Sequence, residues 1–121
     1  MDGYLNTKLI FDSETITAGA DSTTSAIDLN KWRPEGYFSI QVVLTGAGTA
    51  KIEYLLSNDG TNYLEPSTGV DIVLAHTATS GPGADGDDIY VFEPEVARYL
   101  KIKITETGGA SIIATVTLLV Q

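Results

Sequence analysis

The chain has 121 residues, no cysteine, and 16 acidic against 7 basic side chains, for a formal net charge of −9. A chain of this length forms one domain, here 1–121, that buries roughly two-thirds of its unfolded surface. Its composition excludes disulfide frameworks, zinc ribbons and thiol chemistry, and its scattered basic residues argue against nucleic acid or an anionic membrane as a partner.

The N-terminal residues, MDGYLNTKLIF, lack the basic segment and the apolar run of a secretory signal. No window approaches the roughly 20 apolar residues that a membrane span requires. We therefore expect a soluble protein that is made in the cytoplasm without a signal peptide.

Alternation of apolar and polar residues at every second position predicts strands along most of the chain. The clearest strand lies in RYLKIKIT (98–105), where Leu100, Ile102 and Ile104 fall on one face and Lys101 and Lys103 on the other. In chain order the expected strands are 7–17, 24–29, 37–45, 51–56, 70–76, 88–93, 98–105 and 111–120, with a helical turn at 93–98. Turns rich in glycine, proline and aspartate separate them. The pattern predicts an all-β, antiparallel, jelly-roll-like β-sandwich of about 8–9 strands.

The stretch YLLSNDGTNYLEP (54–66) places small polar residues between two apolar runs, which indicates a β-hairpin. A two-residue turn at Asp59-Gly60 would pair Leu56 with Tyr63. A type I turn with a left-handed Gly60 would pair Ser57 with Thr61 and Tyr54 with Leu64. These alternatives bury opposite sides of the second strand, and the sequence leaves both open. Because Asp59 is the only carboxylate here, we interpret the stretch as a register-setting turn rather than a metal site.

Catalytic residues are hard to find. The single histidine, His76, has no nucleophile-elbow serine near it in sequence, so a structural or solvated role is expected. Glu93 and Glu95 flank Pro94, which favours a turn at a strand end over acid–base chemistry. No phosphate-binding glycine loop or dinucleotide fingerprint is present. We expect no enzymatic activity and no cofactor.

The segment HTATSGPGADGDD (76–88) is long, glycine-rich and acidic, and predicts a mobile surface loop. Asp85, Asp87 and Asp88 are weak candidates for calcium, because the spacing lacks the alternate ligands and the final glutamate of an EF-hand loop. A solvated acidic loop without a metal is the favoured interpretation.

Trp32, between Lys31 and Arg33, is either an exposed interface anchor or a residue that closes one end of the sandwich, and we favour the second. The candidate partner-binding residues are Trp32, Arg33, Asn58, Asp59, Asn62 and Tyr63.

Two strings carry a first resemblance. KIEYLLSNDGTNYLE resembles the Ser-x-Asp-Gly-x-x-aromatic hairpin of discoidin-like jelly rolls, and VARYLKIKITETGG is similar to the strand that closes such domains. This resemblance implies a carbohydrate- or surface-binding module, for example on a phage tail.

A second resemblance covers more of the chain. The polar opening DSETITAGADSTTSAIDLNKW, the core GYFSIQVVLTGAGTAKIEYLLSNDGTNY and the closing ARYLKIKITETGGASIIATVTLLV are similar to small acidic β-sandwich virion proteins of tailed bacteriophages and prophages. The resemblance implies a capsid decoration protein, often a trimer, with a major capsid or other virion protein as partner and the virion as its location. The charge of −9 suits the outer shell or the tail better than the DNA-filled interior. We expect contact through the Trp32 turn, the 58–62 tip and the 77–88 loop at one end of the sandwich.

Overall fold

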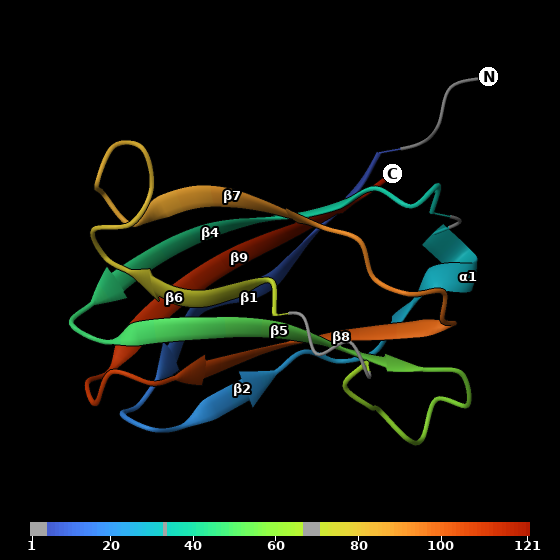
Figure 1. Cartoon of the computed structure of the whole chain (residues 1–121), viewed down its shortest axis with the longest axis horizontal. Helices are drawn as coiled ribbons and strands as arrows, with labels where there is room; N and C mark the ends of the chain where they lie inside the picture. Colours follow the sequence, from blue (N-terminus) through green and yellow to red (C-terminus); the bar gives the residue numbers. More distant parts are fainter. Residues whose placement is uncertain (1–4, 33, 67–70) are drawn as a thin grey trace.

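The computed structural model describes residues 5–32, 34–66 and 71–121, and in this part of the chain nine strands form two antiparallel sheets that pack face to face (Figure 1). The elements are β1 (Asn6–Ile16), β2 (Asp21–Thr23), β3 (Ile27–Asp28), α1 (Leu29–Trp32), β4 (Phe38–Gly46), β5 (Thr49–Ser57), β6 (Val73–Thr77), β7 (Asp87–Phe92), β8 (Tyr99–Glu106) and β9 (Ile112–Val120). The predicted all-β sandwich is confirmed. No described helix is long and apolar enough to span a membrane.

The two sheets differ in their strand order. Sheet A, as we call the first, has the order β1-β9-β4-β7; sheet B has the order β2-β8-β5-β6, with β3 also paired to β8. The strands at the centre of each sheet, β4 and β9 in sheet A and β5 and β8 in sheet B, are those with the strongest predicted alternation. β6 and β7 are edge strands, and the side chains of His76 and Tyr90 join them.

The core lies between the sheets and is built from every second residue of the central strands, because successive side chains of a strand point to opposite faces. Phe38, Ile40, Val42 and Leu44 of β4 are buried, as are the alternate residues of β9 from Ile112 to Val120. Leu100, Ile102 and Ile104 of β8 complete the core from sheet B, as the sequence predicted. This packing makes a rigid platform for the loops at its two ends.

Each end of the sandwich collects a different set of loops (Figure 1). One end carries α1, the loop after β5 and the segment between β7 and β8. The other end carries the β4–β5 turn, the β8–β9 turn and the 78–86 loop, because Thr77 pairs with Thr49 and Asp87 pairs with Val43 there. The expectation that the Trp32 turn, the 58–62 tip and the 77–88 loop share one end is therefore wrong.

Two predicted elements need correction. The strand expected at 24–29 is replaced by the short strands β2 and β3 and by α1, since this polar segment pairs with β8 only at Asp21–Thr23 and Ile27–Asp28. No helical turn forms at 93–98. Pro94 has no N–H to donate, and hydrogen bonds from other segments fix Glu95 and Arg98 in an irregular path.

A buried carboxylate closes the end that carries the β4–β5 turn. Glu106, at the end of β8, is only 1% exposed and accepts hydrogen bonds from the backbone N–H groups of Thr49 (2.9 Å), Gly19 (3.0 Å), Gly109 (2.8 Å) and Gly108. These donors, with Thr49 the strongest, lower the pKa of Glu106 from its ordinary 4.5 to about 2. One ionised side chain therefore ties three turns together.

His76 is fully buried, which supports a structural role. Its Nε2 lies 2.8 Å from the Gly86 carbonyl oxygen and its Nδ1 lies 2.7 Å from the Tyr90 hydroxyl. Because a carbonyl only accepts, Nε2 carries the hydrogen, and in the neutral ring Nδ1 accepts from the Tyr90 hydroxyl. The side chain thus fastens the far end of the 78–86 loop to both edge strands.

Candidate functional site

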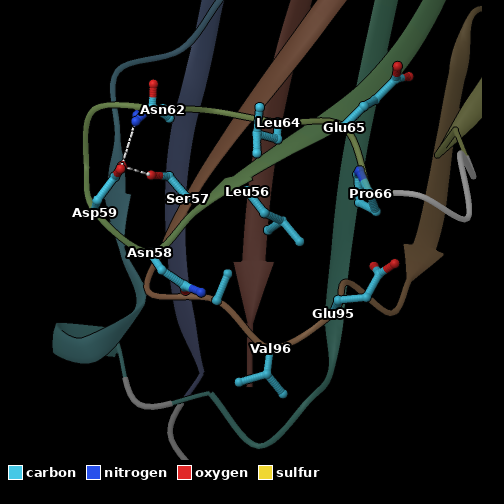
Figure 2. A pocket seen from close by; sticks show the side chains of 11 residues that line it. Leu56, Ser57, Asn58, Asp59, Asn62, Leu64, Glu65, Pro66, Glu95 and Val96 are labelled. Carbon is cyan, nitrogen blue, oxygen red and sulfur yellow. Dashed lines mark hydrogen bonds between the residues drawn. The ribbon is translucent and has the colours of Figure 1, made fainter.

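The loop that follows β5 is organised by the carboxylate of Asp59 (Figure 2). This carboxylate accepts hydrogen bonds from the backbone N–H groups of Asn62 (2.8 Å) and Thr61 (2.9 Å), from the Asn62 side-chain amide (2.8 Å) and from the Ser57 hydroxyl (2.9 Å). These donors, the backbone N–H of Asn62 first, hold the pKa of Asp59 well below its usual range. Gly60 takes a positive φ of 76° and donates its N–H to Ser57 Oγ.

The register of this hairpin differs from both predicted alternatives, which are wrong. Leu56 and Leu64 pair directly, each donating its N–H to the carbonyl of the other at 3.0 and 2.9 Å. Residues 57–63 therefore form a wide loop rather than a tight turn. Because the Asp59 side chain satisfies the backbone donors inside the loop, the strands need not close around two residues.

The loop is anchored to the segment that leads into β8. Asn58 Oδ1 accepts the backbone N–H of Arg98 at 3.1 Å. The ring of Tyr99 lies directly against Gly60, since a Cβ placed on this glycine would stand 3.2 Å from Tyr99 Cε2. The polar tip at residues 58–62 is thus held by the Leu56–Leu64 pair at the base of the loop, by the hydrogen bond to Arg98 and by the ring of Tyr99.

A groove of about 650 Å³ opens between this loop and residues 95–97 (Figure 2). Glu95, on the wall of the groove, accepts a hydrogen bond from the Tyr54 hydroxyl at 2.8 Å, and burial together with Glu95 raises the pKa of Tyr54 to about 12. Two apolar side chains on its walls are strongly exposed: Leu64 at 67% and Val96 at 101%. The groove therefore presents apolar contact area beside the carboxylates of Asp59, Glu65 and Glu95.

The aromatic candidates occupy different environments. Trp32 ends α1 and is half-buried against the core, so it closes this end of the sandwich. Arg33 lies outside the described residues. Tyr63 is half-buried, and Lys101 Nζ lies 4.0 Å from the centre of its ring. The structure brings the four predicted residues of the loop together, and it places Trp32, half-buried against the core, at the same end.

The acidic candidates lie at the opposite end and do not converge. Asp85 accepts the N–H of Asp87 at 3.1 Å, and Asp88 accepts the N–H of Ile89 at 2.8 Å. Asp87 and Asp88 are successive residues of β7, so their side chains point to opposite faces of sheet A. Within the described residues these carboxylates form no cluster that could hold a metal ion.

A carboxylate cluster that the sequence did not suggest lies on the outer side of sheet B. Oxygen atoms of Glu53, Glu65 and Asp71 lie within 4.8 Å of one another. Burial and the hydrogen bond with Glu65 raise the pKa of Glu53, and Lys51 Nζ lies 3.7 Å from Asp71 Oδ1. Lys51 therefore balances part of the negative charge of this cluster. No sequence signal links the three residues, since Glu65 and Asp71 follow the hairpin without periodicity.

Comparisons with known proteins bear on the fold. No family model and no curated protein matches the chain. A chain in the structure of infectious bursal disease virus, Gx strain, matches at a TM-score of 0.52 and 19% identity, over 97% of this chain and 31% of the viral one. Latent PorU from Porphyromonas gingivalis matches at 0.53 and 10% identity, over 100% and 13%.

Two further structures have lower scores. The SPBc2 prophage-derived protein YomS has a TM-score of 0.49 and 9% identity over 100% of this chain and 98% of its own. The C-terminal CBM6 of LamC from Zobellia galactanivorans has a TM-score of 0.43 and 14% identity, over 95% and 90%. This chain spans about a third of the viral chain. At these identities, the matches to the viral chain and to PorU show the fold alone.

Proposed function

We propose that this chain is a non-enzymatic structural protein of a tailed-phage virion, which binds the outer surface of the capsid shell and stabilises it. Its partner is the major capsid protein or another virion protein. The end of the sandwich that carries the Asp59 loop and the 95–97 groove faces that partner.

The observation that carries this proposal is the preformed groove. Its polar wall is fixed before any partner arrives, because Asp59 accepts four hydrogen bonds and Asn58 is tied to Arg98. A fixed loop loses little conformational entropy on binding. The exposed Leu64 and Val96 side chains supply apolar contact area that water otherwise covers.

Charge and fold support the same proposal. A net charge of −9 disfavours a place in the DNA-filled interior and permits one on the outer shell. The sandwich fold is shared with a chain of infectious bursal disease virus, although identity there is only 19%. The sequence resemblance to small acidic phage virion proteins supplies the decoration role.

A carbohydrate-binding module would need an exposed aromatic platform. Trp32 packs against the core and Lys101 covers one side of the Tyr63 ring, which disfavours stacking of a sugar on either residue. Specific binding on a glycan array that is lost on substitution of Tyr63 would contradict our proposal.

A binding experiment with shells tests the proposal. Purified protein is added to capsid shells of the phage whose genome carries this sequence, after removal of the native copies, and the bound fraction is measured by co-sedimentation. Val96→Asp places a charge on the groove wall, and Leu74→Asp places the same charge on an exposed leucine of β6, 68% exposed, outside the groove. We expect stoichiometric binding that only Val96→Asp weakens. Failure of the wild type to bind, or equal loss with both variants, would overturn the proposal.

A further inference from the structure

The outer face of sheet A has a composition unlike the rest of this acidic protein. The strand registers place alternate residues of its four strands on this face. They are Thr7, Leu9, Thr15, Ser39, Gln41, Val43, Thr45, Asp87, Ile89, Val91, Ile113, Thr115, Thr117 and Leu119. Asp87, at one corner, is the sole charged residue in that set. We call this set the neutral face.

Sheet B shows that this composition is not a general property of the fold. Its outer side carries Lys51, Glu53, Lys101 and Lys103 in adjacent register positions, with Glu53 opposite Lys103 and Leu55 opposite Lys101. Alternating strands in both sheets bury equivalent apolar residues, so the core does not require an uncharged exterior on sheet A. The absence of charge is specific to the neutral face.

Apolar side chains on the neutral face are openly exposed. Val91 is 81% exposed and Ile89 is 62% exposed, and Leu9 and Ile113 extend the apolar area across the sheet to β1 and β9. Between them lie threonine side chains, which pack well on a flat pleated surface. Several exposed apolar side chains on one nearly uncharged face of an otherwise charged protein indicate an interaction surface.

The neutral face is large enough for a stable contact. Four strands spaced at about 4.8 Å, over nine residues at about 3.4 Å each, give a flat area on the order of 600 Å². Side-chain relief adds to this, which brings the accessible area close to the roughly 800 Å² per partner of a standard interface. Two such faces pack about 10 Å apart with strands crossing at roughly 30°.

The net charge of the chain indicates which partner binds the neutral face. Each copy carries a net charge of −9, so two copies repel wherever their acidic surfaces meet. The neutral face lets two copies approach without opposed carboxylates, and the same uncharged surface on both partners suits a two-fold axis. Among the described residues of this set, a basic partner would find only Asp87 to pair with. We propose that the neutral face is a two-fold interface with a second copy of this chain, an inference that does not depend on the proposed function.

Sedimentation equilibrium over a range of concentrations tests this proposal. We expect a particle of twice the 12.8 kDa chain mass. Thr117→Lys, at the centre of the neutral face between Leu9 and Gln41, and Val91→Lys, near its β7 edge, each raise the dimer dissociation constant by about 30-fold or more. Leu74→Lys adds the same charge at an exposed leucine of β6, outside both the neutral face and the groove, and leaves the constant unchanged.

Further outcomes separate this interface from others. We expect added salt to lower the dimer dissociation constant, because it screens repulsion between the acidic copies. Salt would raise the dissociation constant of an interface held by opposite charges. Pairing along the free edge of β7 would survive Thr117→Lys, which lies two strands from that edge. Circular dichroism confirms that each variant is folded. A wild-type monomer, a trimer, or a folded Thr117→Lys variant as dimeric as the wild type would overturn the proposal.

Discussion

Replacement of His76 by phenylalanine tests how the 78–86 loop is held. The substitution keeps a ring of similar size in a fully buried position but removes both nitrogen atoms. The Gly86 carbonyl then loses its 2.8 Å hydrogen bond. The Tyr90 hydroxyl loses its 2.7 Å contact and can donate its single hydrogen to Asp88 instead. The Gly86 carbonyl still accepts the backbone N–H of Leu44 at 3.1 Å, so the loss of the two His76 hydrogen bonds costs about 0.5–1.5 kcal/mol each.

We therefore expect His76→Phe to lower the free energy of unfolding by about 1–3 kcal/mol, measured by urea denaturation with an unchanged m value. Tyr90→Phe removes only the hydroxyl, and we expect about half of this loss. Amide exchange in residues 78–86 should accelerate in the His76 variant before the sheets open. A loss below about 0.5 kcal/mol would refute the view that the two hydrogen bonds hold the loop.

Three other predictions concern turns and carboxylates. Since the folded-state pKa of Glu106 is lowered from 4.5 to about 2, the ionised side chain contributes fully to stability above about pH 5, and this contribution is lost as the pH falls towards 2. Urea denaturation at a series of pH values should show this loss in the wild type and a much smaller loss in Glu106→Gln. Gly81→Ala should destabilise by more than about 2 kcal/mol, because its Cβ would stand 1.9 Å from the Asp87 carbonyl oxygen, whereas Gly19→Ala, with similar φ and open space, should cost about 1 kcal/mol by the same denaturation assay. Asp59→Ala should speed amide exchange at Thr61 and Asn62, measured by NMR, and unchanged exchange there would contradict the role of its carboxylate.

Much of the fold can be predicted from sequence because period-two alternation is a local signal. The inward residues of β4, β5, β8 and β9 follow directly from it, and they are buried as expected apart from Leu56 of β5, which is half-buried. The segment 24–29 fails this test because it lies at a sheet edge, where short pairings with β8 leave the polar residues in solvent and the alternation is weak.

The candidate site is only partly predictable, because its geometry depends on contacts between distant residues. Asn58, Asp59 and Asn62 stand out in sequence as turn formers, but the wide loop follows from how Asp59 distributes its hydrogen bonds. The anchor from Asn58 to Arg98 spans 40 residues. Likewise, Glu106 ends a strand with no local sign that donors from Gly19 and Thr49 surround it.

For the neutral face, the sequence predicts which residues of each strand point outward, but it does not predict that these residues lie side by side on one sheet. Period two alone puts Ser39, Gln41 and Val43 on one side of β4, and Thr115 and Thr117 on one side of β9. Only the strand order β1-β9-β4-β7 brings these rows together. Whether such a surface carries charge depends on which strands are neighbours in the sheet, and the sequence alone does not specify the strand order.

The central claim, that this chain is a structural component of the virion's outer surface, is tested most directly by counting its copies in purified particles. Particles of the tailed phage whose genome carries this sequence are purified on a density gradient, and the molar ratio of this chain to the major shell protein is measured by quantitative mass spectrometry. Brief protease treatment of intact particles then reports which copies are exposed. We predict a fixed ratio to the shell protein, with the copies accessible from outside. Absence of the chain from the particles, or full protection inside them, would contradict the claim.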